Sequence, residues 1–306
     1  VTTEANVEYT VSSPVFAGHV PPAALNIGTV TALKILSGSA EANPFNMLDM
    51  GVSAAEYING PLVAASPSGT VMRIYWPSGS GSFASGAGAH MADDDGYDDP
   101  VILHEVGHVV HDLYSDSDSP GGSHTFGDSD QDPLLSFGEG YATFFGSCVM
   151  ESLVRDALYV DMNAASQTGA WQLRMRIETV SPYNTDSFGA ADEGAVACTL
   201  FDIIDNEFSD DQSLGVDDDL MVSSIVVNGK NQHRAWWDVF AGPVNSASSL
   251  NMNHAWDGWF STHAVDPQFT ELQDVFSDRR MKFWSDSSEP DNSIGTAVPV
   301  PFVTST

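Results

Sequence analysis

The segment from residue 99 to residue 114, DPVILHEVGHVVHDLY, constrains this chain more than any other. Asp99 is a good N-cap residue and Pro100 suits the first turn of a helix, so the segment predicts an α-helix. Most of its side chains are apolar, which predicts a helix buried inside the protein. Yet His104 and His108 lie in its middle, four residues apart and therefore on one face.

Two imidazoles on one face of a helix can hold one Zn²⁺, at distances of about 2.0–2.1 Å each. Glu105 follows the first histidine and can lean toward the open coordination position, where a carboxylate accepts a proton from the attacking water. HEVGH therefore predicts a catalytic zinc site with His104 and His108 as ligands and Glu105 as general base. The alternative is a helix with two ordinary, partly buried histidines.

His111 lies near the same face but cannot share a metal ion with His104. The two residues are separated by a rise of about 10.5 Å along a helix, whereas two nitrogens on one zinc are about 3–3.5 Å apart. We therefore expect His111 to pack or hydrogen-bond near the site. A metzincin would need Gly at position 111 and His at position 114, and the chain has His111 and Tyr114 there.

A catalytic zinc needs a third protein ligand, and Glu139 is the best candidate. It lies 31 residues after His108 (139 − 108 = 31), within GEGYA, near the start of the next predicted helix. Two other roles stay open from the residues alone. Ser136 and Glu139 fit a capping box. Four acidic residues also have the spacing of positions 1, 3, 5 and 12 of a calcium-binding loop: Asp128, Asp130, Asp132 and Glu139.

HEVGH with the downstream GEGYA resembles the thermolysin-like zinc metallopeptidases, or gluzincins, especially the fungalysin type, and suggests a secreted bacterial or archaeal enzyme. The resemblance covers about residues 88–146. It implies that zinc is held by His104, His108 and Glu139, that Glu105 is the general base, and that the chain is a secreted endopeptidase. It departs from the family at Thr143, where those enzymes carry an Asp that orients a zinc-bound histidine.

The family also supplies a downstream His or Tyr that stabilises the oxyanion formed during hydrolysis. The segment DEGAVA at residues 192–197 resembles the helix near that donor but contains no histidine. The remaining candidates are Tyr183, His233, His254 and His263. Residues 87–92 stand where the family has an extended edge segment that pairs with the substrate backbone, so we expect substrate binding there.

The resemblance implies an α+β protein with a two-lobed zincin fold. Residues 1–285 would form one catalytic domain, in which a strand-containing N-terminal lobe (about 1–115) and a mainly helical C-terminal lobe (about 116–285) flank an active-site cleft. Residues 286–306 would be a linker or terminal tail. Hydrophobic patterning predicts strands at 7–11, 29–35 and 71–76, a loop or edge strand at 77–89, and further helices at 136–160, 170–179, 192–208, 233–241 and 267–284.

The net charge of the chain limits the kinds of partner that it can bind. The chain has 10 Lys and Arg against 42 Asp and Glu, a net charge of −32, which excludes nucleic acid because phosphate binding needs clustered cations. It lacks a run of about 18 apolar residues, so we expect no membrane insertion. The expected partners are protein or peptide substrates, and the expected state is a monomer.

The aspartate-rich loops predict bound Ca²⁺ in addition to Zn²⁺, because carboxylate oxygens are suitable ligands for Ca²⁺. The candidate ligands are Asp210, Asp211, Asp217, Asp218 and Asp219. The alternative for these loops is a solvated acidic surface suited to salty water. Cys148 and Cys198 fall in predicted helices, where they form either one disulfide or two buried thiols.

Two other functions stay open at this point. One is a zinc aminopeptidase or another zinc hydrolase with the same centre. The other is a calcium-stabilised extracellular binding module in which HEVGH is vestigial.

Overall fold

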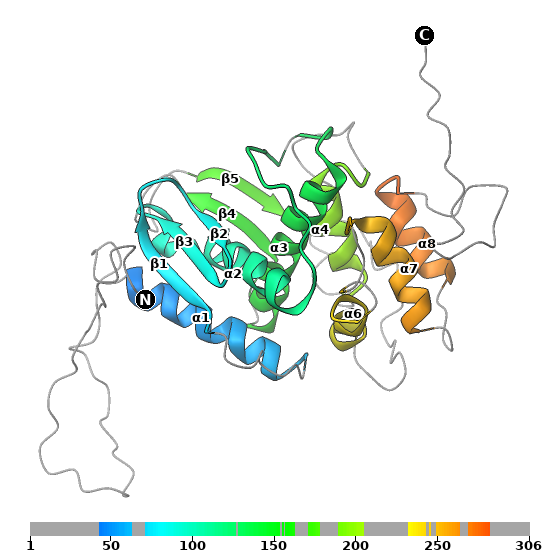
Figure 1. The fold of residues 1–306 in the computed structure, drawn as a ribbon, viewed down its shortest axis with the longest axis horizontal. Coiled ribbons are helices and arrows are strands. Elements are labelled where there is room, and N and C mark those ends of the chain that lie inside the picture. The colour runs from blue at the N-terminus through cyan, green and yellow to red at the C-terminus, as the bar shows by residue number, and fades with distance from the viewer. Residues whose placement is uncertain are drawn as a thin grey trace, which may run out of the picture.

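The structure is a computed structural model, and it contains helices together with two small β-sheets, which confirms the α+β class (Figure 1). None of the helices it describes is long and apolar enough to cross a membrane. The residues that it describes are 43–62, 71–126, 128–153, 155, 157–162, 171–177, 189–204, 232–242, 245, 249–263 and 269–281.

Helices and short strands alternate in the first half of the described chain, and helices alone follow. In chain order the elements are α1 (Asn43–Asn59), β1 (Arg73–Ser78), β2 (Phe83–Ser85), β3 (Gly88–Ala92), the 3₁₀-helix η2 (Asp95–Tyr97), α2 (Asp99–Tyr114), α3 (Pro133–Ser152), β4 (Leu158–Met162), β5 (Trp171–Arg176), α4 (Glu193–Asp202), α6 (Gln232–Phe240), α7 (Met252–Thr262) and α8 (Phe269–Asp278).

The first sheet has the order β1-β3-β2. Strand β3 runs parallel to β1 and antiparallel to β2, with Ala89 opposite both Ile74 and Ala84. The expectation that residues 87–92 form the edge of the sheet is therefore wrong, because β3 takes hydrogen bonds on both sides. The edge nearer the predicted metal ligands is β2, which lies in the segment expected to be loop or edge strand.

Helices α2 and α3 form the centre of the molecule, between the strands and α6, α7 and α8 (Figure 1). They approach closely because Gly107 of α2 lies against the backbone of Ala142 in α3, where an added Cβ would come within 2.8 Å of the Ala142 carbonyl oxygen. Gly140 brings α3 close to α4 in the same way, since a Cβ there would lie 2.7 Å from the Glu193 carbonyl oxygen.

Side-chain caps mark where two central helices begin. The Asp132 carboxylate accepts a hydrogen bond from the Leu134 amide (2.8 Å) at the start of α3. The Asp192 carboxylate accepts bonds from the amides of Gly194 (2.9 Å) and Ala195 (3.1 Å) at the start of α4. Such caps satisfy amides that have no partner inside the helix, so they hold the first turn in place.

Several predicted elements differ from the observed ones. Helix α1 was not predicted and lies between the strands predicted at 29–35 and 71–76; its buried Met47, Met50, Ala54 and Tyr57 recur at helical spacing. The helix predicted for residues 170–179 is wrong, because β5 forms there as one strand of a hairpin with β4. Helix α3 begins three residues earlier than predicted and ends at Ser152.

Other predictions agree with the structure. Helix α2 spans the predicted residues, and β1, α4, α6 and α8 lie within or beside the predicted ranges. Helix α7 was not predicted. Cys148 and Cys198 are both buried and are not joined by a disulfide, so of the two predicted alternatives the structure has two thiols. The predicted strands at 7–11 and 29–35, and the tail at 286–306, lie outside the described residues.

Candidate metal centre

Three predicted ligands from two helices converge on one point. His104 Nε2 lies 3.1 Å from His108 Nε2, and Glu139 Oε2 lies 3.2 Å from the first nitrogen and 3.0 Å from the second. His104 and His108 come from α2 and Glu139 from the second turn of α3, so the packing of the two helices brings the three atoms together.

This arrangement fits a zinc ion. Ligand atoms held about 2.0–2.2 Å from a tetrahedral Zn²⁺ are about 3.3–3.5 Å from one another. The observed separations of 3.0–3.2 Å need to widen by only a few tenths of an ångström to receive the ion. Two imidazole nitrogens and one carboxylate oxygen are also a common donor set for zinc with an open fourth position.

Thr143 orients the first histidine. Its Oγ1 lies 2.9 Å from His104 Nδ1, and both groups are buried. A hydroxyl that accepts a hydrogen bond from Nδ1–H leaves the Nε2 lone pair facing Glu139 and His108. Thr143 therefore makes, with a neutral oxygen, the contact for which the thermolysin-like enzymes use Asp at the same spacing.

The other two roles considered for Glu139 are wrong. The helix cap is made by Asp132, whereas the Ser136 hydroxyl donates to the Ala190 carbonyl oxygen (2.6 Å). A calcium loop does not form either. Asp132 serves as the cap, Asp128 is exposed and accepts from the Asp130 amide (3.1 Å), and the Glu139 carboxylate faces the histidines.

Glu105 lies beside the three ligand atoms and lines a cavity of about 910 Å³, together with His104, His108 and Glu139. The side chain is almost fully buried, and its Oε2 has no hydrogen-bond partner among the described residues. Burial raises the pKa of Glu105 to about 7, although nearby His108 opposes the shift. A carboxylate with a raised pKa and a free oxygen in a cavity can exchange a proton with a bound molecule.

The ligand groups perturb one another strongly. Burial by itself would raise the pKa of Glu139, but hydrogen bonds from His104, His108 and His124 outweigh burial and hold that pKa far below its usual range. Burial would also lower the pKa of His108, yet the bond to Glu139 raises it. For His104 burial prevails, and its pKa is lowered. Glu139 is thus ionised and faces the histidine nitrogens, and a carboxyl group must be ionised to serve as a metal ligand.

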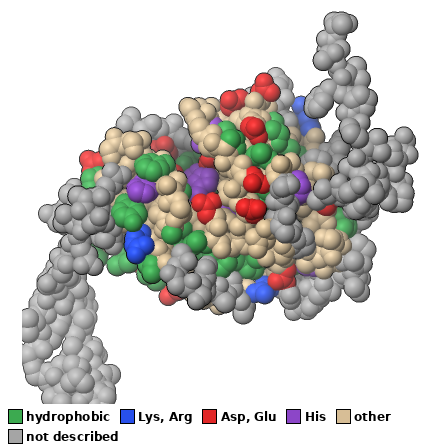
Figure 2. Space-filling model, viewed as in Figure 1, with side chains coloured by type: hydrophobic (Ala, Val, Ile, Leu, Met, Phe, Trp, Pro, Cys, Tyr) green, Lys and Arg blue, Asp and Glu red, His purple; other side chains and the backbone are tan. Residues whose placement is uncertain are grey.

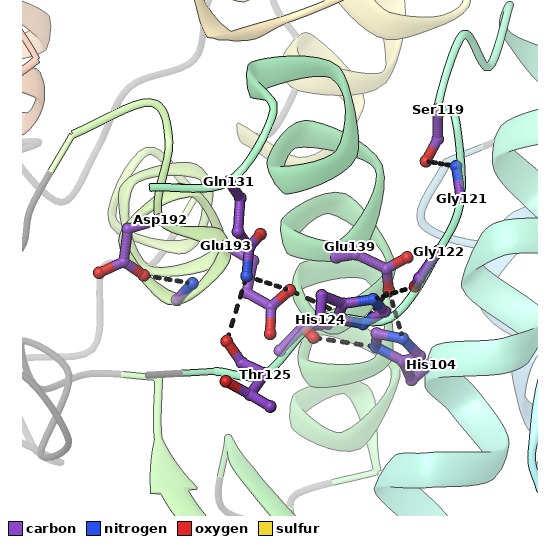
Figure 3. Close-up of polar contacts among 12 residues, drawn as sticks. His104, Ser119, Gly121, Gly122, His124, Thr125, Gln131, Glu139, Asp192 and Glu193 are labelled. Atoms are coloured by element: carbon purple, nitrogen blue, oxygen red, sulfur yellow. Dashed lines mark hydrogen bonds and ion pairs between the residues drawn. The ribbon is translucent and has the colours of Figure 1, made fainter. Parts of the chain in front are cut away.

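Two further residues in the cavity wall were not predicted. His124 Nε2 lies 3.3 Å from Glu139 Oε2 and 3.8 Å from Glu193 Oε2, so its ring stands between the two carboxylates (Figure 3). Glu139 raises the pKa of His124 to about 9, and burial raises that of Glu193 to about 7. Glu193 belongs to the DEGAVA segment, which had already pointed to this region, whereas no spacing in the loop signals His124.

Among the residues proposed as oxyanion donors, those that the structure describes do not line the cavity. His233 Nδ1 lies 2.6 Å from the Tyr57 hydroxyl, and His263 Nε2 lies 3.0 Å from the Ala235 carbonyl oxygen. His254 lies beside Asn251 at the start of α7. Tyr183 lies outside the described residues. Tyr159, which was not predicted, lines the cavity with its ring 5.8 Å from that of His104.

His111 packs near the site, as predicted. Its ring lies 4.9 Å from the ring of Tyr141 and 5.4 Å from that of Phe240. Burial lowers its pKa to about 3. His111 is therefore a neutral core side chain and takes no part in the cluster of ligands.

The predicted calcium ligands at positions 210–219 lie outside the described residues, so calcium stays a prediction. Within the described part, three carboxylates lie close together, and the first and last of them line the cavity: Asp95, Asp98 and Asp161. The Ser82 hydroxyl donates to Asp95. Burial, and then the charges of Asp95 and Asp94, raise the pKa of Asp161 to about 6.

On the face shown in Figure 2, Asp and Glu side chains gather near the middle, and the Lys and Arg side chains visible there lie toward its margins. Neither a comparison with protein-family models nor one with curated proteins found a match for the chain.

Proposed function

We propose that this protein is a secreted, zinc-dependent endopeptidase of the gluzincin type. One observation carries the proposal: His104, His108 and Glu139 direct their ligand atoms to one point in the wall of a large cavity. Beside them lies the Glu105 carboxylate, whose Oε2 has no hydrogen-bond partner among the described residues. The two-lobed zincin fold belongs to the same proposal. It is supported by the strands and the helical half of the chain lying on either side of α2 and α3 (Figure 1).

In this proposal, zinc supplies positive charge that activates water and polarises the scissile carbonyl. His104, His108 and Glu139 hold the ion, and Thr143 keeps the His104 ring in the correct tautomer. Glu105 accepts the proton of the attacking water and then gives it to the leaving amine. Its burial favours this cycle, because a pKa near neutrality lets one carboxyl group act first as a base and then as an acid.

Strand β2 is the candidate surface for the peptide backbone. Phe83 and Ala84 line the cavity, and within the described ranges β2 pairs with β3 alone. An extended peptide can add to such an edge through main-chain hydrogen bonds. We therefore propose β2 as the substrate surface, one strand away from the segment that the sequence had suggested.

The test combines metal content with peptide hydrolysis. The purified protein should contain zinc, cleave casein and internally quenched peptides with blocked ends, lose activity in 1,10-phenanthroline, and regain it with added Zn²⁺. Cleavage of free N-terminal residues alone would identify an aminopeptidase. A protein without zinc and without hydrolysis in calcium-containing buffer would overturn the proposal in favour of a binding module.

Thr143→Val should weaken zinc binding by about 10- to 100-fold, because the His104 ring loses the hydroxyl that orients it. Valine keeps the shape of the threonine side chain. The measurement is competition for Zn²⁺ against a chromophoric chelator. Thr143→Ser keeps the hydroxyl and should restore most of the affinity. Ser147→Ala, one turn further along α3, removes a hydroxyl that donates to the Thr143 carbonyl oxygen (2.9 Å) and serves as the control. Equal affinity in all four proteins would rule out the orienting role.

A further inference from the structure

We propose that the cavity holds a second divalent cation beside the first, bound by His124 and Glu193 and bridged to the zinc site by Glu139. The inference rests on the proposed function, since it uses Glu139 as a ligand of the first ion. It differs from that proposal in predicting two metal equivalents per chain where the three-ligand centre predicts one.

The geometry defines two groups of ligand atoms that share one carboxylate. His104, His108 and Glu139 form the first; His124, Glu139 and Glu193 form the second, and the atoms within each group all lie within 4.8 Å of one another. In the second group His124 Nε2 is 3.3 Å from Glu139 Oε2 and 3.8 Å from Glu193 Oε2. These separations are close to those of two ligands on one tetrahedral ion.

Glu193 has an oxygen that the protein leaves unused. Its side chain is 1% exposed, and Oε2 accepts a hydrogen bond from the Gln131 amide (3.2 Å). The other oxygen, Oε1, is buried and has no hydrogen-bond partner among the described residues. A buried carboxylate oxygen without a partner is costly unless a cation or a proton meets it. Because Glu193 lines the cavity, a cation can reach it from there.

Three separate elements position the second group. Glu139 projects from α3 and Glu193 from the first turn of α4, and the close contact at Gly140 sets the distance between these helices. His124 comes from the loop between α2 and α3, with its Nδ1 3.0 Å from the Gly122 carbonyl oxygen (Figure 3). That contact directs Nε2 toward the carboxylates. One imidazole and two carboxylates suit Zn²⁺ and related transition-metal ions.

The shared carboxylate explains why a second ion is stable so close to the first. Glu139 can bridge two cations, and Glu193 brings a further negative charge to the second site. Around the pair stand three histidines and two glutamates, together with Glu105. A single dication would leave Glu193 and His124 without a metal partner, whereas two use every ligand of both groups.

The experiment is a calorimetric titration of the metal-free full chain with Zn²⁺ alone, together with zinc content after gel filtration at fixed free Zn²⁺. Wild type should bind two equivalents. His124→Ala and Glu193→Gln should each bind one, and His104→Ala should lose the other. Glu151→Gln alters a carboxylate that lies 3.6 Å from His233, a residue outside the cavity wall, and should still bind two. Circular dichroism checks that each variant is folded.

One equivalent in wild type, with zinc-dependent hydrolysis intact, would overturn the second site and leave the proposed peptidase standing. Two equivalents retained in both His124→Ala and Glu193→Gln would also overturn it, because the second ion would then lie elsewhere. A wild-type chain that binds no zinc would contradict both proposals. Loss of one equivalent in the two variants, with the other still bound, supports the second site.

Discussion

Replacing Glu105 with glutamine should lower kcat/KM for peptide hydrolysis by about 10²- to 10⁴-fold while zinc content stays at the wild-type level. Glutamine has the shape of glutamate but cannot take a proton from water at neutral pH. Glu105 makes no contact that holds the three ligand atoms together, so the metal centre should remain assembled. The measurement is steady-state hydrolysis of a quenched peptide beside elemental analysis of the same samples.

Glu56→Gln provides a matched control for this substitution. Glu56 is an exposed residue of α1, and the exchange removes the same charge far from the cavity wall. It should leave kcat/KM unchanged. A Glu105→Gln protein that hydrolyses peptides at the wild-type rate would exclude Glu105 as the general base. A variant that also lost its zinc would show that Glu105 supports metal binding. Hydrolysis would then be measured again after adding Zn²⁺ back, to separate this role from the role of Glu105 as base.

Gly107→Ala should destabilise the fold by about 1–3 kcal/mol and weaken zinc binding together. The new Cβ would lie 2.8 Å from the Ala142 carbonyl oxygen and 2.9 Å from the Ala142 Cα, and both atoms belong to the backbone of α3. Because backbone cannot turn aside as a flexible side chain does, α2 and α3 must separate. That movement carries His104 and His108 away from Glu139.

Urea unfolding in chelator would measure the loss of stability, and competition for Zn²⁺ would measure the loss of affinity. Gly79→Ala is the control, since an added Cβ there meets no atom within 4 Å. A Gly107→Ala protein as stable as wild type, with full zinc affinity, would contradict this prediction, because the two helices would then accept the added Cβ without loss of stability. A variant that is as stable as wild type but binds zinc more weakly would show that the substitution disturbs the metal centre alone.

The central helix and its three chemically informative residues could be predicted from the sequence because they depend on local rules. Pro100 lies in the first turn of α2, as expected, and helical periodicity alone puts His104 and His108 on one face. The predicted cap is wrong, because Asp99 is the first residue of the helix and Asp98, which precedes it, makes no side-chain cap hydrogen bond. The resemblance to a known motif added Glu139. Prediction was weaker for strands. Residues 170–179 were assigned to a helix, but pairing with β4, a contact between separate segments, makes residues 171–176 a strand.

The substrate edge shows the same limit. Residues 88–92 of the expected segment 87–92 form a strand, but whether a strand lies at an edge depends on its neighbours. Strand β3 is flanked by β1 and β2, so the described sheet has its edges at β1 and β2, and the edge that lines the cavity is β2. The orienting partner of His104 is a similar case, because Thr143 is an ordinary helix residue until α2 packs against α3.

By itself, the sequence determined the pair of histidines one helical turn apart with a carboxylate between them, since an α-helix repeats every 3.6 residues. Only the tertiary structure decided which other groups meet that pair. The close glycine contacts at Gly107 and Gly140 bring α2, α3 and α4 within reach of one another, and a loop adds His124. Glu139 therefore faces imidazoles instead of capping its helix, and Glu193 faces His124, because packing between distant segments sets the direction of each side chain.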